Sequence, residues 1–350
     1  MQQQSWLKKN WKLLLNVITI IALCVLVYAI RDQLAATLNN LRHVNAWFLL
    51  LLLPIELLNY HAQTKLYQKL FRIVGNKLKY KFLFRTSLEL NFVNHVFPSG
   101  GVTGFSYYSL RMRKGPRLTG TKATLVHTIK LALTFLSFEL LIGFGLLSLA
   151  VMGKVSNMTI LVASVITTLL LVGTLFGAYI LGSQRRIDIF FTALTKGINK
   201  IIQIVRPKHP ETIKVHRARE IVTDLHDNYQ VIKSNPASLK VPFLYALLAN
   251  VTEILAVYVV YLAFGHAVNI GAVIMAYAVA NFAGLISVLP GGVGIYEALM
   301  TAVMATAGVP AAVSLPVTVM YRVLNTALQL PPGYYFYHKN LQKDKEPANS

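Results

Sequence analysis

Cysteine and charge are both scarce in this sequence of 350 residues. The single cysteine, Cys24, excludes a disulfide within the chain and any cysteine-based metal cluster. Charged residues make up only 13% of the chain, whereas 55% of its residues are hydrophobic and the mean hydropathy is +0.53. This balance excludes an ordinary soluble domain and indicates an all-α, polytopic membrane protein.

Motifs of nucleotide binding and of common catalysis are also missing. The sequence contains no Gly-Lys-Ser/Thr loop, no dinucleotide fingerprint preceded by a strand and no catalytic triad. We therefore predict no cofactor and no metal, and we expect a transporter rather than an enzyme.

Acidic residues are few beside basic ones: 13 Asp and Glu stand against 34 Lys and Arg, which gives a formal charge of +21. The basic residues cluster just outside apolar runs, as the positive-inside rule predicts for cytoplasmic loops. Membrane lipids, mostly anionic ones, are therefore the expected partners, and nucleic acid is not.

Several apolar runs are long enough to cross a bilayer. They are Leu13–Ile30, Ala46–Tyr60, Ala123–Met152, Met158–Gly182, Val241–Phe264, Ile270–Leu289 and Ala311–Tyr337. The first follows Lys8, Lys9 and Lys12 and has no clear cleavage site, so we predict an uncleaved signal-anchor helix. All of these runs except Ile270–Leu289 are predicted to span, which makes six spanning helices with both termini cytoplasmic.

Two stretches rich in glycine and proline interrupt the apolar pattern, one in each half of the chain. They contain Pro98, Ser99, Gly100, Gly101 and Gly104 in the first half, and Pro290, Gly291, Gly292 and Gly294 in the second. Non-helical backbone is tolerated at membrane depth only where protein or a water-filled cavity satisfies its polar groups. Backbone N–H groups at the start of a half-helix favour anions. Both stretches are therefore predicted to form a binding site; a plain helix break or a close helix crossing is the alternative.

Basic clusters at Lys65–Arg85 and Arg111–Lys122 flank the apolar stretch Leu88–Tyr108 on both sides. A single crossing would place one cluster outside, in breach of the positive-inside rule. We therefore predict a re-entrant hairpin that enters from the cytoplasm and returns. The basic tail after His338 should also be cytoplasmic, so Ala311–Tyr337 runs inward and Ile270–Ala307 must begin and end outside. We therefore predict that Ile270–Ala307 is a second re-entrant hairpin that enters from the opposite face.

The chain is thus predicted to be a single integral membrane domain, residues 1–350, built as an inverted repeat. The first repeat comprises residues 1–152 and the second residues 158–337, with a hydrophilic cytoplasmic insert at 184–236. Inverted repeats with discontinuous helices place the binding site of many transporters near the midplane. The insert would offer a docking surface to a cytoplasmic partner, and self-association into a homo-oligomer is left open.

Two smaller expectations concern side chains near the cytoplasmic face. Leu66, Leu70, Phe71 and Val74 fall at helical spacing among lysines, so this segment is predicted to lie along the membrane surface. Lys130, near the cytoplasmic third of its span, is expected to extend its ammonium group toward the interface.

Ionisable residues inside the apolar runs are the main candidates for function, because an intramembrane carboxylate is costly unless it is paired or hydrated. Glu297 and Arg322 are predicted to form a polar core in which Arg322 binds a lipid phosphate and Glu297 orients it. A purely structural ion pair is the alternative. Glu56 and Glu253, which we place at similar positions in the second span of each half, are candidates for proton coupling. Asn94 and Asn281 supply amide side chains that would line the site.

At its two breaks the chain resembles the transmembrane region of the lysylphosphatidylglycerol synthase/flippase family. The matching pieces are Asn94 with Pro98-Ser99-Gly100-Gly101 and Gly104, Leu289-Pro290-Gly291-Gly292-Val293-Gly294 followed by Glu297, and Tyr321-Arg322. The resemblance implies a multi-pass protein of the bacterial or archaeal cytoplasmic membrane that moves lipids between leaflets.

The substrate class implied by the resemblance is an anionic or aminoacylated phospholipid, or a polyprenyl-phosphate-linked intermediate. Bifunctional members of the family carry a further soluble aminoacyl-transferase domain, but this chain ends at Ser350, shortly after Tyr337. The resemblance therefore implies the translocase part alone. Two other functions remain open: a membrane enzyme acting on a lipid headgroup with Glu297 as base, and a non-catalytic membrane partner that docks a cytoplasmic enzyme.

Overall fold

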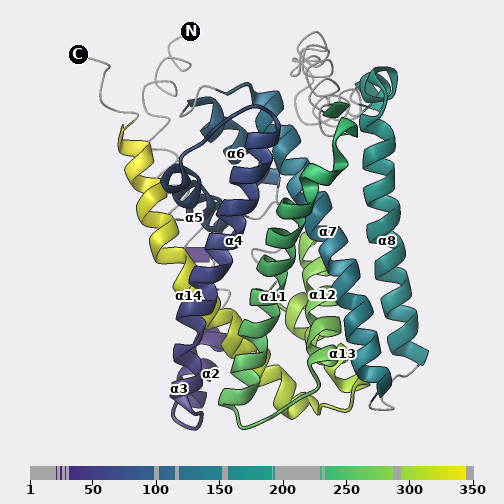
Figure 1. Ribbon diagram of the computed structural model, residues 1–350. Coiled ribbons are helices and arrows are strands. Elements are labelled where there is room, and N and C mark those ends of the chain that lie inside the picture. Colours follow the sequence, from purple (N-terminus) through teal and green to yellow (C-terminus); the bar gives the residue numbers. More distant parts are fainter. Residues whose placement is uncertain are drawn as a thin grey trace, which may run out of the picture.

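The computed structural model is a bundle of helices, and no strand occurs among the residues it describes (Figure 1). Those residues are 21, 24, 25, 28, 31–97, 102–114, 118–151, 157–190, 192–193, 229–230, 233–286 and 293–343. The predicted all-α class is confirmed. The predicted first span and most of the insert at 184–236 lie outside the described residues.

The helices follow one another in this order: α2 (Arg31–Asn40), α3 (Ala46–Leu50), α4 (Leu52–Ile73), α5 (Tyr80–Val96), α6 (Val102–Lys114), α7 (Gly120–Val151), α8 (Asn157–Leu181), the 3-10 turn η1 (Pro236–Leu239), α11 (Lys240–Ala263), α12 (Ile270–Ile286), α13 (Ile295–Thr306) and α14 (Ala311–Lys343).

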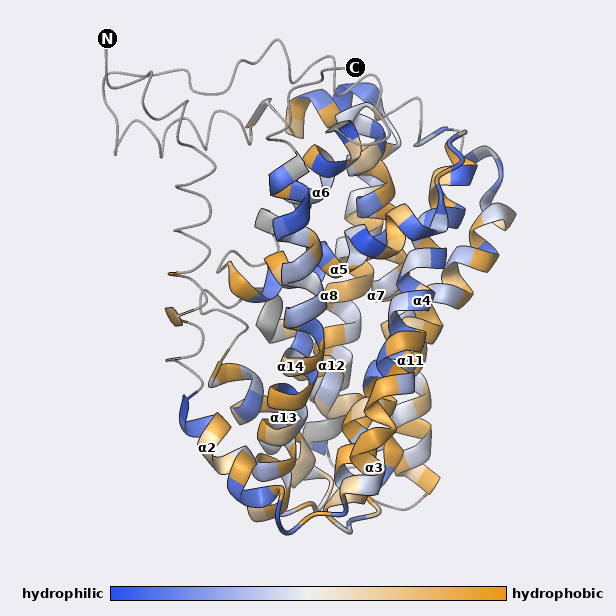
Figure 2. Cartoon of the chain, turned by 90° about the vertical axis from the view of Figure 1, so that its left-hand side faces the viewer, coloured by the Kyte–Doolittle hydropathy of each residue, from blue (hydrophilic) through white to orange (hydrophobic). Residues whose placement is uncertain are grey.

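Long apolar helices make up most of the bundle. Among the described residues, four helical segments are long and apolar enough to cross a membrane: Gly120–Val151, Ser164–Leu181, Pro236–Ala263 and Ala311–Gln342. In α8, only 11% of the segment Ser164–Leu181 is buried in the protein, so most of this segment is available to lipid. Hydrophilic residues gather at the upper end of the bundle, and hydrophobic ones predominate along the helices below it (Figure 2). These features identify a multi-pass membrane protein.

Helices α4 and α11 pack against each other in antiparallel orientation. The Asn45 N–H, just before α3, donates to the Ala263 carbonyl at the end of α11 (2.8 Å). Further along, the Asn59 side-chain amide donates to the Ala249 carbonyl and to Thr252 Oγ1, both at 2.9 Å. These polar contacts explain why α4 runs beside α11 along its length although it is too polar to count as an apolar span.

The prediction for the segment after Tyr60 is wrong. Instead of ending there and lying along the membrane surface, helix α4 continues to Ile73. Leu66, Leu70, Phe71 and Val74 are 0 to 5% exposed and pack with Leu125 and Val126 of α7. The helical spacing of these residues was therefore a sign of a face buried in protein, while the lysines point outward.

The turns that follow α4 and α11 have the same geometry. Gly75 and Gly265 adopt positive φ angles of 81° and 78°, which close the two helices with matching hydrogen bonds. In the first turn, Asn76 N–H donates to the Phe71 carbonyl (2.8 Å); in the second, His266 N–H donates to the Tyr261 carbonyl (3.0 Å). The helices that come next, α5 and α12, are both 17 residues long.

Each turn leads into a pair of shorter helices and then into a very long one. Helices α5 and α6 pack together at one end of the molecule, and α12 and α13 at the other (Figure 1). The long helices α7 and α14 follow these pairs. The breaks themselves, with Pro98, Ser99, Gly100, Gly101, Pro290, Gly291 and Gly292, lie outside the described residues.

The long helix that follows each pair packs against the first short helix of the other pair. At the crossing of α14 with α5, a Cβ added at Gly333 would lie 2.6 Å from Phe92 Cβ and 2.7 Å from the Leu88 carbonyl. At the crossing of α7 with α12, Gly145 faces the Gly271 backbone, and a Cβ there would come within 3.3 Å of it. Small residues thus let both crossings approach closely.

Candidate functional site

The inner ends of both helix pairs meet at a polar cavity of about 330 Å³. It is lined by Gln63, Asn91, Asn94, His95, Lys130, Glu253, Tyr277, Asn281, Tyr296, Tyr321, Arg322, Asn325, Thr326 and Gln329. Asn91, Asn94 and His95 lie at the end of α5, Asn281 near the end of α12, and Tyr296 at the start of α13. Described residues that flank both breaks therefore lie at one cavity.

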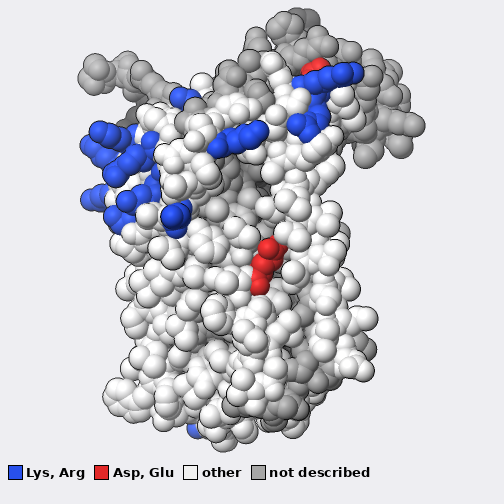
Figure 3. All heavy atoms as spheres, turned by 45° about the vertical axis from the view of Figure 1, so that its right-hand side comes forward, with Lys and Arg blue, Asp and Glu red and all other residues white. Residues whose placement is uncertain are grey.

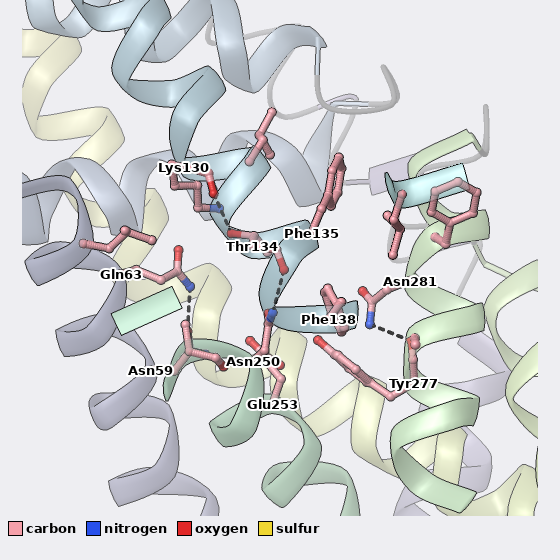
Figure 4. Close-up of a pocket in the computed structure, with 16 residues that line it drawn as sticks. Asn59, Gln63, Lys130, Thr134, Phe135, Phe138, Asn250, Glu253, Tyr277 and Asn281 are labelled. Carbon is pink, nitrogen blue, oxygen red and sulfur yellow. Dashed lines mark hydrogen bonds between the residues drawn. The ribbon is translucent and has the colours of Figure 1, made fainter. Parts of the chain in front are cut away.

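A second, more apolar cavity of about 220 Å³ adjoins the polar one. Gln63, Lys130, Glu253, Tyr277 and Asn281 line both. Its remaining lining is largely apolar and comes in the main from α7, α8, α11 and α12, with Leu131, Phe135, Phe138, Leu170 and Phe282 among its members. In Figure 4, Phe135 and Phe138 lie between Lys130 on one side and Asn281 on the other. The combined space is therefore polar in one part and apolar in the other.

Glu297 and Arg322 form a direct ion pair, as the sequence predicted. Glu297 lies in the first turn of α13, and its carboxylate also accepts hydrogen bonds from the Gly294 N–H (2.7 Å) and from Gln33 Nε2 of α2 (2.9 Å). The Arg322 guanidinium lies 4.9 Å from the centre of the Tyr296 ring. Glu297 thus orients Arg322 and caps α13, and only Arg322 reaches the cavity lining.

Glu253 lies in the wall of both cavities, and the Tyr321 hydroxyl donates to its Oε2 (2.9 Å). Glu56 is buried near Glu253, and its Oε1 has no hydrogen-bond partner within the described part of the chain. The two glutamates do not occupy similar positions: Glu56 is in the second turn of α4, whereas Glu253 lies beyond the middle of α11. The antiparallel packing of these helices, rather than equivalence, brings the carboxyl groups together.

The predicted amide and glycine residues have different places. Asn94 and Asn281 line the polar cavity, and Asn281 Nδ2 donates to the Tyr277 carbonyl (3.1 Å). Gly104 of α6 lies so close to the Asn94 side chain that a Cβ would overlap it. Gly294 is the N-cap of α13 and donates to Glu297, but it does not line either cavity.

Several lining residues were missed or given another role. Lys130 was expected to reach the interface, but it lines both cavities. Gln63 and Tyr277 were not singled out, because one polar residue in a span is common in helix contacts. A signal for Gln63 was present in the sequence, because Gln63 stands as far before Gly75 as Glu253 stands before Gly265.

Glu89 of α5, a further buried carboxylate, was also missed. Its Oε2 accepts hydrogen bonds from the Tyr107 hydroxyl (2.7 Å), Arg111 Nε (3.0 Å) and Asn340 Nδ2 (3.3 Å). These contacts join α5 to α6 and to the end of α14. The spacing between Glu89 and Arg111 crosses the break between α5 and α6, so helical periodicity could not reveal their pairing.

Together these features define a class of protein: a multi-pass helical membrane protein with a polar cavity and an adjoining apolar cavity. The chain belongs to the family described as the lysylphosphatidylglycerol synthase TM region, whose model matches residues 14–333. The predicted family is thereby confirmed.

One relative is a UPF0104 membrane protein of Methanothermobacter thermautotrophicus. The two chains are 28% identical over 225 residues, which cover 60% of this chain and 61% of the relative. The match therefore spans less than two thirds of the relative's length.

Proposed function

We propose that this protein translocates a lipid between membrane leaflets. The substrate would be an anionic or aminoacylated phospholipid, or a polyprenyl-phosphate-linked intermediate. Its membership of a family named after lysylphosphatidylglycerol synthesis supports a role in lipid handling.

The observation that carries this proposal is the union of a polar and an apolar cavity. A lipid has both characters, and its headgroup would lie among Arg322, Lys130 and the amides while an acyl or prenyl chain follows the apolar part toward α8. An ion or small polar solute would not need the wall formed by Leu131, Phe135 and Phe138.

Arg322 is the proposed phosphate-binding group, because a guanidinium matches phosphate oxygens in bidentate fashion. Glu297 positions it from the side away from the cavity. Glu297 is poorly suited to act as the base of an enzyme, since Arg322, Gln33 and the Gly294 N–H already occupy its oxygens. Glu56, whose Oε1 has no hydrogen-bond partner among the described residues, and the neighbouring Glu253 are the proposed place for a coupling proton.

The proposed topology has six spanning helices and two re-entrant hairpins, arranged as an inverted repeat in the cytoplasmic membrane with both termini inside. The matching turns at Gly75 and Gly265 and the equal lengths of α5 and α12 support two repeats. On the face that Figure 3 presents, almost all Lys and Arg side chains lie at the upper end, which we take as the cytoplasmic side.

Two cysteine variants test this topology. Lys77→Cys and Ala267→Cys place a thiol at equivalent exposed positions of the two turns, and the single natural cysteine would be replaced beforehand by Cys24→Ser. In intact cells an impermeant maleimide should label the Ala267→Cys protein and reach the Lys77→Cys protein only after lysis. Labelling of both from the same side would refute the inverted repeat.

Translocation itself is tested in liposomes that contain the purified protein and fluorescent phosphatidylglycerol. Loss of fluorescence from the inner leaflet after addition of an impermeant quencher should be faster with the wild-type protein than in empty liposomes. Arg322→Ala should abolish the difference, with its folding checked by size-exclusion chromatography. Equal rates for the wild-type protein and empty liposomes, with phosphatidylglycerol, an aminoacylated analogue and a polyprenyl phosphate alike, would rule out the proposed activity.

A further inference from the structure

Two basic residues reach the polar cavity from opposite ends of the molecule. Lys130 lies about three turns into α7, and Arg322 about three turns into α14. Both helices follow a helix pair, and they begin at opposite ends of the bundle (Figure 1). Lys130 and Arg322 therefore approach the middle of the molecule from the two sides and line the same cavity.

Other residues of the lining correspond in the same way. Asn91 and Asn281 stand equally far after Gly75 and Gly265, and Gln63 and Glu253 equally far before them. All four line the polar cavity. The cavity thus combines two equivalent sets of side chains, each with a cation, an asparagine and a Gln or Glu.

The two cations differ in their partners. Arg322 is held by Glu297, whereas no carboxylate of the described residues lies within ion-pair distance of Lys130. Glu253 lines the same two cavities as Lys130, and the Tyr321 hydroxyl donates to its carboxylate. Figure 4 shows Lys130 beside Gln63 and Thr134 at one side of the apolar cavity. Lys130 is half-buried. An ammonium that is partly withdrawn from water into a cavity wall, without a paired carboxylate, is unfavourable unless a ligand or water compensates it.

We infer that Lys130 is a second anion-binding group of this cavity, the counterpart of Arg322 in the other repeat, and that both hold the phosphate of a lipid as it passes. The inference rests on the proposed function and adds to it. Lys130 is approached from the end where basic residues gather, and Arg322 from the opposite end. An anionic headgroup crossing the protein meets the two cations in turn.

Binding measurements separate this inference from translocation itself. The full-length protein in nanodiscs of phosphatidylcholine would be titrated with short-chain phosphatidylglycerol and, in a second arm, with inorganic phosphate. Lys130→Gln and Lys130→Met should weaken phosphatidylglycerol binding about tenfold or more, because one charge-assisted hydrogen bond is lost. Lys130→Arg should bind within a few-fold of the wild type. Phosphate should bind more weakly than the lipid, because it gains nothing from the apolar cavity.

Lys122→Gln is the matched control, since Lys122 precedes Lys130 on α7 and lines neither cavity. It removes the same charge and should leave binding unchanged. The neutral variants at Lys130 should unfold at a temperature no lower than that of the wild type, because they remove a half-buried charge that has no ion-pair partner in the described part of the chain. If they are destabilised instead, Lys130 is a structural residue and the inference fails.

The outcomes distinguish the two proposals. Phosphatidylglycerol binding that is the same in wild type, Lys130→Gln and Lys130→Met overturns the role of Lys130 and leaves the lipid site at Arg322 standing. Binding that phosphate alone reproduces with equal affinity overturns the lipid as ligand. Absence of any anion binding by the wild type overturns both.

Discussion

Two buried carboxylate–arginine pairs, Glu89–Arg111 and Glu297–Arg322, are closely similar in chemistry and burial. The arginine side chains are 17% and 15% exposed, and the glutamate side chains 2% and 6%. Each guanidinium lies 4.9 Å from the centre of an aromatic ring, Phe82 for Arg111 and Tyr296 for Arg322. What differs is the surroundings: Arg322 lines the polar cavity, and Arg111 lines neither cavity.

The comparison shows that a buried ion pair is not by itself a sign of a binding site. Glu89 gathers donors from α5's partner α6 and from the end of α14, so it holds helices together. Glu297 also joins helices, but its arginine faces open space. The position of the cation relative to a cavity is the feature that separates the two pairs.

The largest expected difference between the pairs is in transport. Arg322→Lys keeps the charge but loses the planar fork, so lipid translocation should fall about tenfold or more if a charge-assisted contact to phosphate is lost. Arg111→Lys should translocate at nearly the wild-type rate in the same liposomes. Equal losses in the two variants would mean that both pairs are structural.

Removal of the carboxylates should destabilise both regions but with different responses to lipid. Glu89→Gln and Glu297→Gln each leave a buried guanidinium uncompensated, a loss of about 3–5 kcal/mol in the free energy of unfolding. Thermal unfolding in detergent measures this loss. Added phosphatidylglycerol should restore part of it in Glu297→Gln, because the anion can bind beside Arg322.

The Glu89→Gln protein supplies the control for that experiment. In that variant Arg111 has lost its carboxylate partner but lines neither cavity, so the same lipid should raise its unfolding temperature no more than that of the wild type. Equal recovery of both variants would indicate a general effect of the lipid rather than binding at Arg322.

The smallest expected effect concerns the close helix crossings. Gly333→Ala forces a methyl group toward Phe92 and the Leu88 carbonyl and should cost about 1–3 kcal/mol of stability. Gly143→Ala on α7 has nothing within 4 Å of the new methyl group and should be neutral or slightly stabilising. Thermal unfolding of the two variants side by side tests whether α14 and α5 approach as closely as described.

Composition and local pattern alone determined the membrane class, the two glycine-rich breaks and the family, because these depend on residue type and short spacing. The pairing of Glu297 with Arg322 was also accessible, since few groups in apolar runs can compensate a buried charge. The described flanks of both breaks lie at the polar cavity, whereas the binding site predicted at the breaks remains a prediction.

Only the tertiary structure decided which helix faces are buried in the protein and which remain exposed on its surface. The apolar face of Leu66, Leu70 and Phe71 has the same periodicity whether it meets a bilayer or α7, so sequence could not choose between them. The same holds for Lys130, whose long side chain could reach the interface or the interior. Its place in the cavity, the approach of Glu56 to Glu253 and the pairing of Glu89 with Arg111 all depend on how helices distant in sequence pack against one another.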